Sequence, residues 1–296
     1  VWVEDHRVVG LDPTDPLKYG GKEQTRMFPE KMLTPPMSGA KAAHALYDEE
    51  KHGTTLTEKA IAWVQKHAPT KNNESGTNNP FFLYFATPHI HHPFTAGARF
   101  KGSSECGPYG DFIQEFDWMV GEVMRTLDEL KLRDNTLIIL TSDNGGMLNQ
   151  GGQQAWKAGH RLNGDLLGFK FDAWEGGHRV PFIARQPGRI PAGLTSDAMA
   201  MGIDILPTLM AWTGRPLPAA ELDGVDISPL LTTRAAATPH DELLLFNNED
   251  VAAIRTSRWK YIVRSYYRSI EAPLDTPGRD DWEQLIDLSN DPSESY

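Results

Sequence analysis

Two short apolar runs most constrain the fold of this chain. Residues 80 to 87 read PFFLYFAT and residues 136 to 141 read TLIILT, and both are continuous apolar stretches of strand length. Such runs predict strands that are buried on both faces. Between them, apolar residues recur at helical spacing from Asp111 to Leu132. Strand, helix and strand together predict a βαβ unit, and therefore an α/β domain whose largely parallel sheet is sandwiched by helices.

Further elements are predicted on either side of this unit. We expect a helix that begins at Thr55, with Thr55 as its N-cap and Glu58 completing a capping box. Residues 180 to 184 form a predicted strand, and residues 204 to 213 a predicted helix that Gly214 ends.

Beyond Asp223 the pattern changes to short strands separated by turns. Residues 243–246, 251–256 and 260–262 predict a small antiparallel sheet. We therefore expect two parts: an α/β domain in residues 1–232, and a small α+β subdomain in residues 233–296 that contains this sheet.

The composition excludes several classes of function. The formal net charge of −11 argues against non-specific nucleic-acid binding, which needs a basic surface. No apolar run approaches the roughly 20 residues that a membrane-spanning helix requires. Cys106 is the single cysteine, so the chain has no intrachain disulfide framework.

Two predicted strands end in residues that can carry chemistry. In open parallel sheets, ligands bind beyond the carboxyl ends of strands. The strand at 136–141 runs into Asp143-Asn144, followed by two glycines. A carboxylate beside a carboxamide offers two hard oxygen ligands for Ca²⁺ or Mg²⁺. The same residues are also common turn chemistry, and spacing alone leaves both interpretations open.

The apolar run at 80–87 leads into three histidines, His89, His91 and His92. Histidines can serve as metal ligands, proton donors or anion contacts. Lys170 lies further along, in a long glycine-rich loop, and could bind an anionic oxygen as a point charge. Taken alone, a lysine in a loop is more often solvated.

Joined in order, these pieces resemble a known family. An apolar strand is followed by H-x-H, the next strand by S-D-N-G-G, and then comes K-x-x-x-W-E-G-G-x-R-x-P. This series resembles the formylglycine-dependent sulfatases of the alkaline phosphatase superfamily, and especially the bacterial arylsulfatases and N-acetylgalactosamine-6-sulfatase-like enzymes. The resemblance covers essentially the whole chain, which looks like the C-terminal portion of such an enzyme.

The resemblance implies a role for each matching position. Asp143 and Asn144 match two metal ligands, usually for Ca²⁺. His91 matches a histidine that contacts the sulfate and is a candidate acid for the leaving alcohol. Lys170 matches a lysine that binds a sulfate oxygen. The implied substrate is a sulfated small molecule or glycan, and the expected location is the periplasm or the outside of the cell.

The sequence departs from the family at the nucleophile. The family converts the cysteine of a C-x-P-S-R motif to formylglycine, but Cys106 is followed by Gly107-Pro108-Tyr109-Gly110. We interpret Cys106 as an ordinary loop thiol. The aspartate pair that completes the family's metal site has no match either. We therefore expect the chain to be a fragment with an incomplete Ca²⁺ site, inactive by itself, whose nucleophile is supplied by a missing N-terminal segment.

Two alternatives stay open. One is a phosphodiesterase or phosphonate hydrolase of the same superfamily, although Asn144 argues against it because that motif tends towards Asp-His. The other is a non-catalytic remnant that binds sulfated glycans.

Overall fold

The computed structural model describes residues 2–11, 14, 46–68, 80–148, 150–247, 250–263 and 283–295. The chain divides into two compact units. The first consists of Val1–Lys131 and Gln153–His160, and the second of Leu132–Gly152 and Arg161–Tyr296. The units are described separately below, and the boundary expected at residue 232 stays a prediction.

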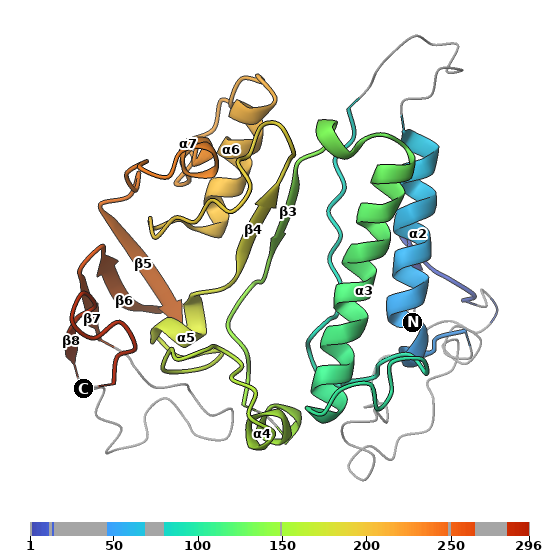
Figure 1. Cartoon of the computed structure of the whole chain (residues 1–296), viewed down its shortest axis with the longest axis horizontal. Coiled ribbons are helices and arrows are strands. Elements are labelled where there is room, and N and C mark those ends of the chain that lie inside the picture. The colour runs from blue at the N-terminus through green and yellow to red at the C-terminus, as the bar shows by residue number, and fades with distance from the viewer. Residues whose placement is uncertain are drawn as a thin grey trace. The chain divides into compact units, whose positions relative to one another are not determined.

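The first unit is built on two helices that pack along each other, α2 (His52–His67) and α3 (Gly107–Glu129) (Figure 1). Helix α2 buries residues spaced three or four apart, which is the stripe that an amphipathic helix presents to a core. A short hairpin, β1 (Val3–Glu4) with β2 (Arg7–Val8), lies in the same unit.

The predicted start of the first helix was wrong. A 3-10 turn, η1 (Glu49–Lys51), precedes α2, and the carboxylate of Asp48 accepts a hydrogen bond from the backbone N–H of Glu50 at 3.0 Å. Because Asp48 caps the helical segment seven residues before Thr55, Thr55 lies inside the helix instead of at its N-cap.

Residues 80–87 do not form the predicted strand. The run is extended, with alternate side chains half-buried, while Phe82 is 70% and Tyr84 81% exposed. A strand requires a neighbouring backbone to complete its hydrogen bonds, and no described segment pairs with this run. The parallel pairing expected with residues 136–141 is therefore absent among the described residues, where every paired strand is antiparallel.

In the second unit, β3 (Ile138–Thr141) pairs with β4 (Phe182–Arg185) in antiparallel fashion. A 3-10 turn, η2 (Arg133–Asn135), leads into β3. The chain between the two strands contains α4 (Gln150–Lys157) and the four-residue helix α5 (Glu175–His178). The candidate residues Asp143, Asn144 and Lys170 all lie on this β3–β4 connection.

After β4 come η3 (Gly202–Asp204), α6 (Ile205–Trp212) and α7 (Ser228–Thr232). The predicted end of the helix at Gly214 is confirmed, since this glycine adopts the left-handed conformation with φ of 66°. None of the described helices is both long and apolar enough to cross a membrane.

The second unit also contains a four-stranded antiparallel sheet of β5 (Glu242–Asn247), β6 (Asp250–Thr256), β7 (Trp259–Ile262) and β8 (Gln284–Asp287) (Figure 1). The predicted antiparallel sheet is therefore confirmed. One face of the sheet packs into a core with Ala173 and Met199; its members are Leu243, Leu245, Ala252, Ala253, Ile262, Ile286 and Leu288. Because Ala173 lies two residues before α5, this core brings the sheet against the β3–β4 connection.

Candidate functional site

Asp143 and Asn144 lie just after the end of β3 and are accessible to solvent. The carboxylate of Asp143 is exposed, and Asn144 is half-buried. The amide nitrogen of Asn144 donates to the carbonyl of Gly145 at 2.9 Å. This bond uses the nitrogen of the carboxamide and leaves its oxygen available to a ligand.

The backbone beyond Asn144 lies directly against α5. The N–H of Gly145 donates to the carbonyl of Gly177 at 2.9 Å. A Cβ atom at position 145 would lie only 1.7 Å from the carbonyl oxygen of Gly176. Only glycine permits this approach, which explains physically why a glycine follows Asn144.

A backbone hydrogen bond holds Lys170 against the loop after β3. Its N–H donates to the carbonyl of Gly146 at 2.9 Å. The side chain of Asn163 reinforces this contact, because it accepts from the N–H of Gly146 at 2.7 Å and donates to the carbonyl of Gly168 at 2.9 Å. The structure therefore places Lys170 on a segment that is hydrogen-bonded to the loop that carries Asp143 and Asn144.

The donor set at this position suits a hard cation. Asp143 and Asn144 offer oxygen ligands on consecutive residues, and Ca²⁺ and Mg²⁺ prefer oxygen. Within the described ranges, no three His, Cys, Asp or Glu side chains converge to hold a metal ion. The chemistry of the two residues fits Ca²⁺, while their number is below the six to eight ligands that Ca²⁺ takes.

His91 belongs to the first unit and is exposed. Its Nδ1–H donates to the carbonyl of His92 at 2.6 Å, and its backbone N–H donates to the carbonyl of Pro88 at 2.8 Å. Because Nδ1 carries the donated proton, Nε2 is the ring atom that is left to exchange a proton with a ligand.

His89, to which no role was assigned from the sequence, is completely buried. Its Nε2 lies 3.2 Å from Oε2 of Glu115 on α3, and its ring lies 3.9 Å from that of Phe112. The same Glu115 oxygen accepts from the N–H of Gly97 at 3.1 Å. This pair anchors the histidine segment to α3. Glu115 occupies a core position of α3. Sequence reasoning missed it because the apolar periodicity of this helix drew attention only to its apolar residues.

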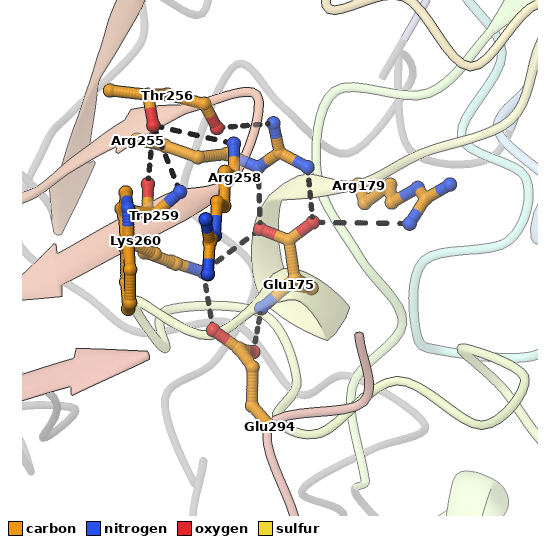
Figure 2. A network of polar contacts seen from close by, with 8 residues as sticks. All are labelled: Glu175, Arg179, Arg255, Thr256, Arg258, Trp259, Lys260 and Glu294. Atoms are coloured by element: carbon orange, nitrogen blue, oxygen red, sulfur yellow. Dashed lines mark hydrogen bonds and ion pairs between the residues drawn. The ribbon is translucent and has the colours of Figure 1, made fainter. Parts of the chain in front are cut away.

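Helix α5 carries the second buried carboxylate, Glu175 (Figure 2). Its Oε1 lies 3.1 Å from Nζ of Lys260 and 3.1 Å from Nε of Arg255, and its Oε2 lies 3.2 Å from Nη2 of Arg255. Arg179 reaches the same carboxylate at 4.0 Å from the solvent side. A further carboxylate, Glu294, accepts the backbone N–H of Glu175 at 2.5 Å and lies 2.9 Å from Nζ of Lys260.

Burial and these neighbours shift the pKa values of Glu175, Glu294 and His178. Burial by itself raises the pKa of Glu175, but Lys260 and Arg255 outweigh it, so the pKa is lowered. Burial raises the pKa of Glu294, and the attraction of Lys260 only partly offsets it. Burial, helped by Lys260, lowers the pKa of His178.

Cys106 and Trp174 have structural contacts. Cys106 is a free, half-buried cysteine at the N-cap of α3, where its N–H donates to Oγ of Ser104 at 3.1 Å. The indole of Trp174 packs on the core of the C-terminal sheet and donates to Oε1 of Gln284 at 3.1 Å.

The chain matches two family models. One is described as Sulfatase and matches residues 16–215; the other is described as N-sulphoglucosamine sulphohydrolase, C-terminal, and matches residues 170–296.

Curated relatives agree with these models. An N-acetylgalactosamine-6-O-sulfatase of Bacteroides thetaiotaomicron is 35% identical over 323 residues, which cover 99% of this chain and 60% of the relative. Human arylsulfatase A is 35% identical over 238 residues, which cover 74% of this chain and 44% of the relative. The chain thus spans less than two thirds of the length of either relative.

Solved structures share the fold. One from work on the metabolism of multiple glycosaminoglycans by Bacteroides thetaiotaomicron matches with a TM-score of 0.81 and 32% identity, covering 99% of this chain and 64% of that chain. The PsFucS1 sulfatase of a Pseudoalteromonas species matches with a TM-score of 0.65 and 26% identity, covering 83% of this chain and 48% of that chain. The predicted fold class, α/β with an antiparallel sheet towards the C-terminus, is confirmed.

Proposed function

Because the chain belongs to the sulfatase family, we propose that it forms part of a hydrolase that cleaves sulfate esters of a carbohydrate or an aryl compound. The observation that carries the proposal is the backbone hydrogen bond from Lys170 to Gly146, which joins the segment of Lys170 to the loop that carries Asp143 and Asn144. The curated relatives include an N-acetylgalactosamine-6-O-sulfatase and an arylsulfatase, which supports this class of substrate.

In this proposal Asp143 and Asn144 hold Ca²⁺ through their side-chain oxygens. A bound Ca²⁺ would neutralise negative charge on the sulfate group. The other ligands of the ion, and a nucleophile of the formylglycine-hydrate type, are expected from a segment outside these 296 residues. Cys106 has no part in this chemistry.

Lys170 and His91 act on the substrate itself. The ammonium group of Lys170 binds a sulfate oxygen and stabilises charge that develops as the ester bond breaks. His91 holds its Nδ1–H on the carbonyl of His92, so a protonated ring presents Nε2–H as the acid for the leaving alcohol.

The test is hydrolysis of an aryl sulfate by the polypeptide that the whole reading frame encodes. We expect Lys170→Ala to lower turnover by on the order of 10²-fold or more, since it removes an electrostatic contact to the reacting group. Lys157→Ala, which removes an exposed lysine of α4, is the control and should leave turnover unchanged.

Three outcomes would contradict the proposal. Turnover of Lys170→Ala within about threefold of the parent would remove this residue from the site. Faster hydrolysis of a phosphate diester than of the aryl sulfate would place the protein among the phosphodiesterases. Binding of a sulfated glycan without any hydrolysis would identify a non-catalytic binding protein.

A further inference from the structure

A fully buried lysine of the C-terminal sheet, Lys260, contacts α5. Lys260 lies on β7 at a position that faces the core, and its side chain is 0% exposed. Its Nζ lies between two carboxylates, 3.1 Å from Oε1 of Glu175 and 2.9 Å from Oε1 of Glu294 (Figure 2). An ammonium group in such a place is tolerated only while these partners remain.

Apart from the exposed Arg179, the charged groups of this network balance one another. The two carboxylates of Glu175 and Glu294 meet the two cations of Lys260 and Arg255, and Arg255 binds Glu175 through two nitrogens. Besides its contact with Lys260, Glu294 accepts a hydrogen bond from the backbone N–H of Glu175, which is the first residue of α5. The network thus fixes both the side chain and the backbone at the start of this helix.

The far end of α5 supports the candidate site. Gly177, two residues after Glu175, accepts the N–H of Gly145, and Gly145 follows Asn144 directly. Gly176 donates to the carbonyl of Leu167 at 2.7 Å, which holds the loop that leads to Lys170. A displacement of α5 would therefore move both segments that carry the candidate residues.

A buried ion network is a poor source of stability, because well-packed apolar residues of similar volume often stabilise a protein as well or better. Directional hydrogen bonds do, however, impose a unique geometry on the groups that they join. The role of this network is therefore more readily understood as positioning than as stabilisation.

We propose that Lys260, Arg255 and Glu294 are positioning residues: through Glu175 they hold α5 in place, and α5 in turn holds Asp143, Asn144 and Lys170 in register. The proposal deepens the sulfatase function proposed above and rests on it, because that function gives Asp143, Asn144 and Lys170 their roles. It assigns to the C-terminal sheet a part in catalysis although the sheet contributes no group that touches the substrate.

The experiment compares three variants of the polypeptide that the whole reading frame encodes. Lys260→Met leaves the two carboxylates with one buried cation. The double variant Lys260→Met/Glu294→Leu removes one charge of each sign and keeps the Glu175–Arg255 pair. Ile262→Ala, next on the core face of β7, weakens the packing of the same strand without touching the network.

Two readouts are measured well below the melting temperature of each variant. One is amide hydrogen exchange in peptides that cover residues 143–148 and 167–178, and the other is kcat and KM for an aryl sulfate. We expect both network variants to exchange at least about tenfold faster in these peptides and to lose roughly 10- to 10²-fold in kcat, because small misplacements are costly in catalysis. Ile262→Ala should lose thermal stability, while its amide exchange in these peptides and its kcat should stay close to those of the parent.

The double variant separates positioning from stabilisation, since its restored charge balance should raise its melting temperature above that of Lys260→Met. If it regained parental exchange and kcat together with stability, the proposal would be overturned. Loss of protection and kcat in Ile262→Ala to the same extent would overturn it as well. If the parent polypeptide hydrolysed no sulfate ester, the proposed function would fail, whereas the exchange data would still decide whether the network holds the two segments.

Discussion

Single buried carboxylates organise several parts of this protein. Glu115, Glu175 and Asp204 are almost fully buried, and each meets a basic side chain: His89 at 3.2 Å, Lys260 at 3.1 Å and His240 at 2.8 Å, respectively. Glu115 and Asp204 each accept a backbone N–H as well, and the backbone N–H of Glu175 donates to Glu294. None of these pairs could be predicted from the sequence, because the partners lie up to 85 residues apart and local patterns do not report such distant contacts.

At the candidate metal site, we expect Ca²⁺ to raise the melting temperature of the polypeptide encoded by the whole reading frame, and Asp143→Ala to abolish this increase. A ligand that binds only the folded state stabilises it, so loss of a ligand residue removes the effect. Thermal unfolding with and without Ca²⁺ measures it. Asp165→Ala, an exposed aspartate of the same connection, is the control and should keep the full increase. An undiminished Ca²⁺ effect in Asp143→Ala would place the ion elsewhere.

His178 predicts a dependence of stability on pH. Burial and Lys260 lower its pKa below the ordinary value of 6.5, with Glu175 opposing the shift. Below pH 6.5 the unfolded chain therefore binds a proton that the folded protein does not, and stability is lost as the pH falls towards the lowered pKa. We expect His178→Gln to reduce the fall in melting temperature between about pH 7 and about pH 5.5.

His67→Gln, which removes an exposed histidine of α2, is the control for this measurement. His52 keeps part of the pH dependence in both variants, because burial lowers its pKa too. Equal slopes in the parent and in His178→Gln would show that His178 binds its proton equally in the folded and unfolded states.

Among the elements, α5 has an influence beyond its four residues. It joins the loop after β3 to the network of the C-terminal sheet, and glycines line the contact on both sides. The sequence predicted the importance of the loop after β3 and of Lys170, because strand ends and glycine pairs are local signals. It did not predict α5, because E-G-G-H has little helical propensity and the helix exists through its tertiary contacts.

Gly145→Ala tests the close approach of this loop to α5. The added methyl group would lie 1.7 Å from a backbone oxygen, so one of the two segments must move. We expect a loss of about 1–3 kcal/mol in the free energy of unfolding, measured by urea denaturation. Gly121→Ala is the control: position 121 is an exposed site within α3 with open space around it, and alanine there should stabilise by roughly 0.5–1 kcal/mol. Equal stability of Gly145→Ala and the parent would contradict the geometry.

For the molecule as a whole, the sequence predicted the class of fold better than its strand pairing. The antiparallel sheet and the helices α3 and α6 follow from local periodicity, and they were found within a few residues of their expected limits. The extended run at 80–87 shows why pairing is harder to predict. Its apolar composition predicts a strand buried on both faces, yet alternate side chains along it are exposed among the described residues.

The C-terminal sheet has an apolar row on its outer face. Leu244, Ile254, Tyr261 and Leu285 are cross-strand neighbours, and Leu244 is 45% and Leu285 68% exposed. We expect the 296-residue chain to self-associate with rising concentration, and Leu285→Glu to reduce this without lowering stability by more than about 0.5 kcal/mol. Sedimentation velocity over a range of concentrations measures it. Ile286→Glu, on the opposite face, should instead unfold the sheet, and equal effects of the two variants would contradict this assignment of faces.

The bond between Glu175 and Glu294 also has a consequence for biosynthesis. The two residues are 119 positions apart, so a ribosome that adds about 5–20 residues per second needs roughly 6–24 s to pass from one to the other. Throughout that interval Glu175 lacks this partner, and for much of it Lys260 has not been translated either. The contacts around the loop that carries Lys170 are therefore completed only after residue 294 has been translated, and translational pausing before that residue would prolong the time during which the loop is open to proteases.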